Sequence, residues 1–197
     1  MSAVPLVTIA VEGTSDVFVL RRLLRDHGLD VHAIHGQRGK AYLDQKLGAF
    51  NAAAQFAPWL VLRDLDHDAP CAAGFVSRHL PEPSAHMHFR LAVPSIEAWL
   101  LADAAGFSRY FAVPAQALPT APERLRDAKL ALMSVVRKSR SRAIRQDVLP
   151  AKRSTAAVGP GYVAVIGEFV QNEWSWRRAA RRSESLQRCV RRIESMR

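Results

Sequence analysis

Cysteine is scarce in this chain, whose 197 residues include only Cys71 and Cys189. Two widely separated cysteines form neither a metal-type spacing nor a disulfide framework, so a small disulfide-bonded scaffold is excluded and we expect reduced thiols. The sequence also lacks apolar runs of the roughly 18 residues that a membrane-spanning helix needs. No basic flank precedes an apolar run at the start, which argues against a signal peptide. We therefore expect a cytoplasmic protein without a membrane partner.

Positive charge is in excess, and it is concentrated in the second part of the chain. Hydrophobic residues make up 49% and charged residues 23% of the sequence, values typical of a folded globular protein. The formal net charge is +10. Residues 1–123 carry 10 basic and 12 acidic side chains, whereas residues 124–197 carry 18 basic and 6 acidic ones. This basic segment predicts a polyanionic partner, and we favour nucleic acid, either DNA or RNA, over an anionic membrane surface.

Strand and helix patterns alternate in the first half of the chain. Short apolar or β-branched runs predict four strands, at residues 6–11, 30–34, 58–62 and 88–93. Helical patterns separate them, which indicates an α/β fold with a mainly parallel sheet sandwiched by helices. The remainder reads as helix or loop, with helices expected over residues 124–145, 162–174 and 176–193. We place a boundary near residue 105, with an α/β domain over 1–105 and a basic helical subdomain over 106–197 packed on it.

Acidic side chains follow three of the predicted strands. Glu12 and Asp16 flank the turn after the first strand, Asp64 and Asp66 follow the third, and Glu97 opens the helix after the fourth. In open parallel sheets, ligands bind beyond the carboxyl ends of the strands. Carboxylates that converge there repel one another unless a cation lies between them, and Mg²⁺ prefers oxygen ligands. All five acids are therefore candidate ligands of Mg²⁺ or Mn²⁺. The alternative is that they only form turns or complement helix dipoles.

Two of these acidic motifs together resemble the TOPRIM domain, the catalytic module of topoisomerases, bacterial primases, ribosomal RNA maturases and OLD-family nucleases. Glu12, within residues 11–16, resembles the invariant glutamate of that family, and Asp64-Leu65-Asp66 resembles its DxD motif. The resemblance covers about residues 6–93. It implies that Asp64 and Asp66 bind Mg²⁺ and that Glu12 acts as general acid or base. Asp16 resembles a second acidic position of OLD-type members, and the run 96–103, which contains Glu97, is similar to one in bacterial TOPRIM-like proteins.

The size of the chain narrows the activity that this resemblance implies. A topoisomerase needs strand-passing domains and a nucleophilic tyrosine, and a primase brings a zinc module. We therefore predict Mg²⁺-dependent hydrolysis of phosphodiester bonds by a small nuclease. The alternative is a non-catalytic module that binds nucleic acid or a protein partner, such as a component of a bacterial defence or toxin–antitoxin system.

Four basic residues are candidates for phosphate contacts. Arg38 and Lys40 belong to the glycine-containing loop 36–40, which is too short for a phosphate-binding loop but lies near the end of the second predicted strand. Arg177 and Arg181 belong to the arginine-rich C-terminal region. We expect these side chains to position a nucleic-acid backbone without reading its sequence. The alternative is that they form solvated surfaces.

Overall fold

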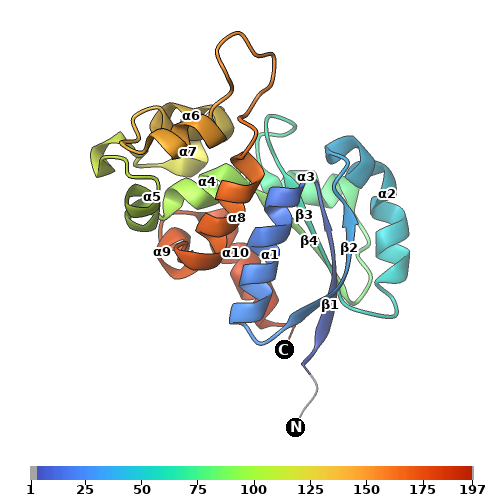
Figure 1. The fold of residues 1–197 in the computed structure, drawn as a ribbon. Helices are drawn as coiled ribbons and strands as arrows, with labels where there is room; N and C mark the ends of the chain where they lie inside the picture. The colour runs from blue at the N-terminus through green and yellow to red at the C-terminus, as the bar shows by residue number, and fades with distance from the viewer. Residues whose placement is uncertain (1–3, 197) are drawn as a thin grey trace.

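A parallel four-stranded sheet forms the centre of the computed structural model, which describes residues 4–196 (Figure 1). The strands lie in the order β2-β1-β3-β4, and every neighbouring pair is parallel. Their bounds are Leu6–Val11 for β1, Asp30–Gly36 for β2, Trp59–Asp64 for β3 and Met87–Ala92 for β4. The expected α/β fold with a mainly parallel sheet is therefore confirmed.

Helices cover both faces of the sheet, because side chains of successive strand residues point to opposite faces. In β1, Ile9 and Val11 join the core on the side of α1, whereas Ala10 joins the core on the other side. The three helices that connect the strands are α1 (Thr14–Asp26), α2 (Lys40–Ala53) and α3 (Ala72–His79). Helices α2 and α3 contribute to the second core, opposite α1.

The helices that follow β4 pack on the same side of the sheet as α1. Helix α8 lies directly beside α1 (Figure 1). One continuous apolar core contains residues from β1, α1 and the C-terminal helices, so the two parts of the chain pack together. The boundary near residue 105 stays a prediction. Within the described part of the chain, no helix combines the length and apolar character needed to cross a membrane. The helices are α4 (Ile96–Ala102), α5 (Ala104–Tyr110), α6 (Ala128–Val136), α7 (Arg142–Val148), α8 (Tyr162–Asn172), α9 (Trp176–Ala180) and α10 (Glu184–Glu194), with the 3₁₀ turns η1 (Ala115–Ala117) and η2 (Pro122–Arg124).

Two of the helices expected from the sequence are divided. The stretch 124–145 contains α6 and α7, and the stretch 176–193 contains α9 and α10. Each second helix begins after a serine whose hydroxyl accepts a hydrogen bond from the backbone three residues on, Ser141 from Ile144 at 3.3 Å and Ser183 from Leu186 at 3.2 Å. Serine favours this N-cap position, so each break has a local cause that the prediction of one long helix overlooked.

Candidate active site at the carboxyl edge of the sheet

The carboxyl ends of the two central strands bring the first predicted acids together. Val11 of β1 is paired with Leu62 of β3, so the residues that follow each strand are neighbours. The backbone N–H of Asp64 donates to Oε1 of Glu12 at 2.8 Å. Oδ1 of Asp64 in turn accepts a hydrogen bond from the backbone N–H of Ile96 at 3.1 Å. These bonds join the ends of β1 and β3 to the start of α4.

Four carboxylates gather at this edge, and we call them the inner carboxylates: Glu12, Asp16, Asp64 and Glu97. Asp16 and Glu97 are only 5% and 3% exposed. Burial, together with the neighbouring Glu97 and Glu12, raises the pKa of Asp16 to about 7. Burial and the negative charges of Asp16, Glu97 and Glu12 raise the pKa of Asp64 well above its ordinary value. Burial also raises the pKa of Glu12. Burial and nearby like charges therefore both act against ionisation of Glu12, Asp16 and Asp64.

Glu97 is held by side chains from three different elements. The hydroxyl of Ser95 donates to its Oε2 at 2.6 Å, and the hydroxyl of Tyr162 in α8 donates to its Oε1 at 3.0 Å. The ammonium of Lys129 in α6 lies 3.3 Å from Oε1. Burial acts to lower the pKa of Lys129, but the negative charge of Glu97, Asp64 and Asp16 outweighs this effect and raises it. The C-terminal helices thus complete the acidic site.

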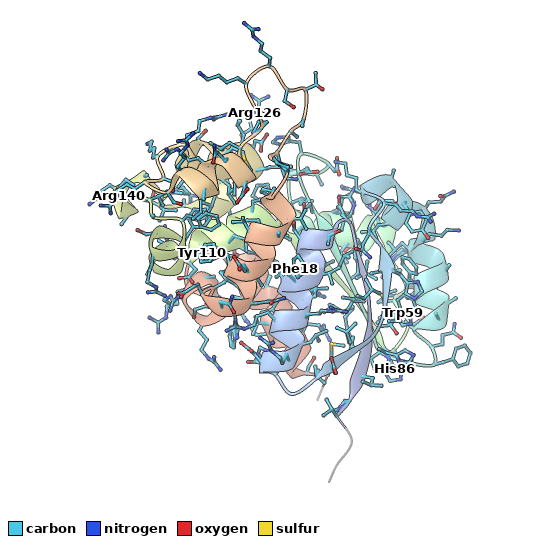
Figure 2. The ribbon with its side chains drawn as sticks, viewed as in Figure 1. Phe18, Trp59, His86, Tyr110, Arg126 and Arg140 are labelled. Carbon is cyan, nitrogen blue, oxygen red and sulfur yellow. The ribbon has the colours of Figure 1, made fainter. Side chains whose placement is uncertain are left out.

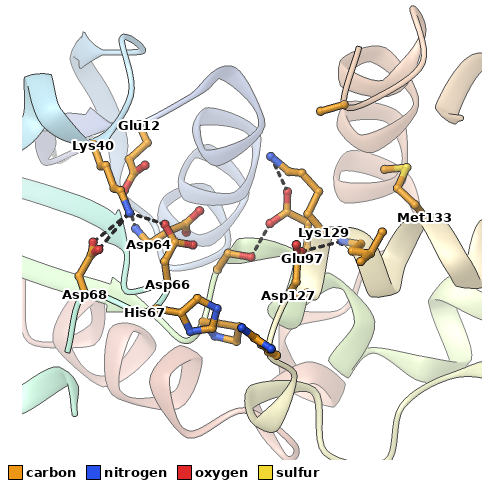
Figure 3. A pocket seen from close by; sticks show the side chains of 16 residues that line it. Glu12, Lys40, Asp64, Asp66, His67, Asp68, Glu97, Asp127, Lys129 and Met133 are labelled. Carbon is orange, nitrogen blue, oxygen red and sulfur yellow. Dashed lines mark hydrogen bonds and ion pairs between the residues drawn. The ribbon is translucent and has the colours of Figure 1, made fainter. Parts of the chain in front are cut away.

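The outer carboxylates, Asp66 and Asp68, have cationic partners instead. Nζ of Lys40 lies 2.9 Å from Oδ2 of Asp66 and 3.0 Å from Oδ2 of Asp68, as Figure 3 shows. Asp66 has a left-handed backbone with φ of 47°, and its N–H donates to the carbonyl of Pro94 at 2.8 Å. Because β3 ends at Asp64, this turn directs Asp66 toward Lys40. The two carboxylates of the DxD motif therefore have different partners.

Arg63 joins one outer carboxylate, Asp68, to Asp44 of α2. Its guanidinium is 3% exposed and makes two hydrogen bonds to the carboxylate of Asp44, at 2.8 and 2.9 Å, and one to Asp68 at 2.7 Å. Although burial acts to raise the pKa of Asp68, the hydrogen bonds from Arg63 and Lys40 lower it. The guanidinium also lies over the ring of Phe75, 4.4 Å from its centroid. This network fixes the loop after β3.

An open pocket of about 680 Å³ is lined by both outer carboxylates and by three of the inner ones, Glu12, Asp64 and Glu97 (Figure 3). Its opposite wall comes from residues at and before the start of α6, including Arg126 and Lys129, and from Ala157 in the loop between α7 and α8. That loop projects from the end of the molecule where the strands terminate (Figure 1), and Arg126 lies near its base (Figure 2). It carries the exposed cations Lys152 and Arg153. The pocket therefore has an acidic floor and a basic rim.

The four basic candidates lie in different places. Lys40 pairs with the outer carboxylates, while Arg38 is exposed, with its guanidinium 5.3 Å from the ring centroid of Tyr42. Arg177 and Arg181 are exposed beside α10 and line a different pocket. The structure thus brings together Glu12, Asp16, Asp64 and Glu97, with Asp66 and Lys40 beside them, and it leaves Arg177 and Arg181 outside the acidic pocket.

Three residues of the site were not among the sequence candidates: Arg126 and Lys129, which line the pocket, and Tyr162, whose hydroxyl donates to Glu97. Lys129 and Tyr162 bind Glu97, and Arg126 faces the same cavity. The only signal in the sequence was the general basic character of the second part of the chain. That signal could not single out these positions, because it does not say which helix packs beside which strand.

The chemistry of the inner carboxylates suits a hard divalent cation. Their donor atoms are all oxygens, and a cation such as Mg²⁺ or Mn²⁺ would relieve the repulsion that, together with burial, raises the pKa values of Asp16 and Asp64. Within residues 4–196, however, no three His, Cys, Asp or Glu side chains are placed as a ready-made group of metal ligands. The donor set fits the ion by type, and its members would have to adjust around it.

Comparisons of the chain with models of protein families, with curated proteins and with solved structures find no match. Membership of the TOPRIM family therefore stays a prediction from the motifs at Glu12 and Asp64. The pocket itself is the basis on which a function can be inferred.

Proposed function

We propose that this protein is a metal-dependent nuclease that hydrolyses phosphodiester bonds in DNA or RNA. One observation carries the proposal: three carboxylates, Glu12, Asp64 and Glu97, line a pocket whose facing wall carries Lys129 and Arg126, and the buried Asp16 lies close to them. An acidic floor suits a divalent cation, and a basic wall suits the phosphates of a polyanion. The resemblance of Glu12 and Asp64 to TOPRIM motifs supports the same activity.

The carboxylates at this edge of the sheet would have different chemical roles. Asp64 and Glu97, with Asp16 and Asp66 as further candidates, would hold Mg²⁺ or Mn²⁺. When bound, the ion supplies Lewis-acid stabilisation of the charge that develops on the phosphoryl group. Glu12 accepts a hydrogen bond from the N–H of Asp64 and lines the pocket, and burial raises its pKa above its ordinary value. This combination suits Glu12 to accept the proton of the attacking water, and it leaves Glu12 available as a further metal ligand.

Basic side chains around the pocket would hold the substrate backbone. Lys129 and Arg126 line the pocket, and Lys152 and Arg153 extend from the loop at its rim. Arg38, Arg177 and Arg181 would contact phosphates further from the scissile bond. Contacts of this kind give affinity that falls with salt and carries little sequence information.

A second candidate is a non-catalytic module that binds nucleic acid or a protein partner through the same pocket. The ion pairs of Lys40 favour it, because they already give Asp66 and Asp68 a cationic partner without a metal. A component of a bacterial defence or toxin–antitoxin system would fit this description.

A cleavage assay separates the two candidates. Labelled single- and double-stranded DNA and RNA are incubated with the protein and Mg²⁺, Mn²⁺ or EDTA. The wild type is compared with Asp64→Asn, which keeps an acceptor for the N–H of Ile96. The matched control is Glu82→Gln, an exposed acid in the loop before β4, at the opposite edge of the sheet.

We expect metal-dependent cleavage by the wild type and by Glu82→Gln, and none by Asp64→Asn. Cleavage that persists in EDTA or in Asp64→Asn would contradict the assignment of the site. Binding of nucleic acid by all three proteins without cleavage would support the non-catalytic module.

A further inference from the structure

Helix α6 has an exposed stripe that begins in the acidic pocket. Leu130, Ser134 and Arg137 are exposed, and their spacing of four and then three residues places them on one face of the helix. Leu130 and its neighbour Lys129 line the pocket. We call these residues and Lys138, which is exposed beside Arg137, the α6 stripe. The stripe therefore leads from the acidic pocket to the far end of α6.

Positive charge is concentrated at that far end. Residues 128–146 contain six basic side chains and no acidic one. Four of them are exposed around the turn between α6 and α7, and we call them the far cations: Arg137, Lys138, Arg140 and Arg142. Arg140 lies at the outer end of the helical side of the molecule, away from the sheet (Figure 2). The stripe thus ends in a cluster of like charges.

The far cations have no acidic partner in the part of the chain that the structure describes. None of the ion pairs within residues 4–196 includes one of them. Arg137 donates to the hydroxyl of Ser134 at 3.5 Å, and this neutral acceptor leaves its charge uncompensated. On α10, by contrast, Arg188 is paired with Glu184. A surface of unpaired like charges favours a polyanionic partner.

The helix sets the distance between the pocket and the far cations. Lys129 and Arg137 are eight residues apart, which corresponds to about 12 Å along an α-helix. Successive phosphates of one strand of a duplex lie ~3.4 Å apart along its axis, so this distance spans about three to four nucleotides. The buried side of α6, which includes Leu132, Val135 and Val136, packs into the main core and fixes this spacing.

We propose that the α6 stripe binds the sugar–phosphate backbone of the nucleic acid, with the far cations on phosphates about three to four nucleotides from the phosphate in the acidic pocket. This inference rests on the proposed function, since it takes the acidic pocket as the position of the cleaved bond. It adds the direction in which one side of the substrate extends, along α6 and away from the sheet.

A nucleic acid suits this surface better than an acidic protein segment does. Its backbone carries a negative charge at every nucleotide, which matches cations that recur along a stripe. The stripe is the exposed face of a helix and offers no strand edge for main-chain pairing, and Leu130 is its one large apolar side chain. A peptide would therefore have few contacts beyond charge.

A binding assay tests the surface without cleavage. Labelled single- and double-stranded oligonucleotides of DNA and RNA, sixteen nucleotides long, are titrated with the full chain in EDTA, and their anisotropy is measured at several salt concentrations. The double substitution Arg137→Gln/Lys138→Gln should weaken binding about tenfold and lower the slope of log K against log salt concentration by about two phosphate contacts. Arg140→Gln/Arg142→Gln probes the same surface independently and should have a similar effect.

The matched control is Arg21→Gln/Arg25→Gln, which removes two exposed arginines of α1. It changes the net charge by the same amount and should weaken binding less than about twofold, because these positions lie outside the α6 stripe. Thermal melts of all the variants check that each is folded.

Cleavage in Mg²⁺ measures the spacing. In an oligonucleotide that the wild type cleaves at one mapped bond, single phosphates are replaced by neutral methylphosphonates. Replacement about three to four nucleotides from that bond, on one side, should raise KM about fivefold for the wild type. The same replacement should have almost no effect on Arg137→Gln/Lys138→Gln, which has already lost the contact. The kcat should stay the same, because this phosphate is remote from the cleaved bond.

Several outcomes would overturn this inference. Equal losses for Arg137→Gln/Lys138→Gln and Arg21→Gln/Arg25→Gln would show that only the overall charge matters. A methylphosphonate effect that is the same in wild type and in Arg137→Gln/Lys138→Gln would exclude the far cations as the contact. Binding of a polyglutamate peptide through the far cations, without binding of any oligonucleotide, would assign the surface to an acidic protein segment. Oligonucleotide binding through the far cations without cleavage would instead contradict the nuclease and leave the α6 stripe as a nucleic-acid surface.

Discussion

Asp64 and Asp68 lie four residues apart and line the same pocket, yet their surroundings shift their pKa values in opposite directions. Asp64 is half-buried among the other inner carboxylates, and its pKa is raised. Asp68 receives hydrogen bonds from Arg63 and Lys40, and its pKa is lowered. The outer carboxylates thus have Lys40 and Arg63 as cationic partners, whereas burial and nearby like charges raise the pKa values of Glu12, Asp16 and Asp64.

Raised pKa values of this kind are typical of a functional site. Charged groups in a purely structural network are paired, as Arg63 is with Asp44. Groups whose pKa values are strongly perturbed by burial and by like charges cluster at sites of catalysis and binding. We therefore expect the inner carboxylates, rather than the outer ones, to carry the chemistry of the proposed site, and four predictions test this expectation.

The largest difference should appear in cleavage. We expect Glu12→Gln to lower kcat by about 10³-fold, because a glutamine cannot accept the proton of the attacking water. Asp68→Asn should lower it by less than about tenfold, since a general base typically contributes far more than a peripheral charge. Single-turnover assays with saturating metal measure both variants. Similar losses for the two would remove the distinction between inner and outer carboxylates.

The pH dependence of stability should follow from the raised pKa of Asp16, which is about 7 when folded and close to 4 when unfolded. The folded state then binds its proton more tightly, so this contribution to stability is present below pH ~4 and is lost as the pH rises to ~7. Asp16→Asn should therefore stabilise the metal-free protein relative to wild type at pH 8 by a few kcal/mol, but not at pH 4. Urea unfolding across this range measures the difference.

Mg²⁺ provides a check on the same result. It should stabilise the wild type more at pH 8 than at pH 5, because ionised carboxylates bind it. Glu82→Gln, which changes an exposed acid, should behave like the wild type throughout. A stability difference between Asp16→Asn and wild type that stays constant with pH would show that Asp16 titrates normally.

The cation beside the inner carboxylates should act on substrate binding. Lys129 is half-exposed and faces the pocket from α6, so Lys129→Ala should raise KM about tenfold. The slope of log K for nucleic-acid binding against log salt concentration should fall by the amount expected for about one lost phosphate contact. Lys46→Ala, at an exposed lysine of α2, is the matched control. Equal effects of the two substitutions would mean that Lys129 contributes only to the overall charge.

The smallest effect should come from removing an outer carboxylate. Asp68→Ala deletes one partner of Arg63 and one of Lys40, but Asp44 still holds the buried guanidinium. We expect a loss of about 1 kcal/mol in the free energy of unfolding, measured with urea at pH 7. A gain in stability would show instead that repulsion from nearby acids outweighs the ion pairs of Asp68.

Much of the sheet could be predicted from local sequence. The run Leu6–Val11 is apolar and β-branched, it forms β1 with the expected bounds, and Glu12 follows it at the edge of the sheet. The residues after β3 were also placed correctly at that edge. Their division into inner and outer carboxylates was not predictable, because the left-handed turn at Asp66 and its bond to the carbonyl of Pro94 depend on a distant part of the chain.

The sequence therefore determined three features: the order of strands and helices, the acids after the strands and the basic second part. Propensity and periodicity act over a few neighbouring residues, so these features can be recognised without the fold. Only the tertiary structure decided that Lys129 and Tyr162 reach Glu97 and that Lys40 pairs with Asp66 and Asp68. An amphipathic pattern determines which face of a helix is buried, but many packings bury the same face. The choice among them comes from the fit of the whole core, which brings groups far apart in the chain within one pocket.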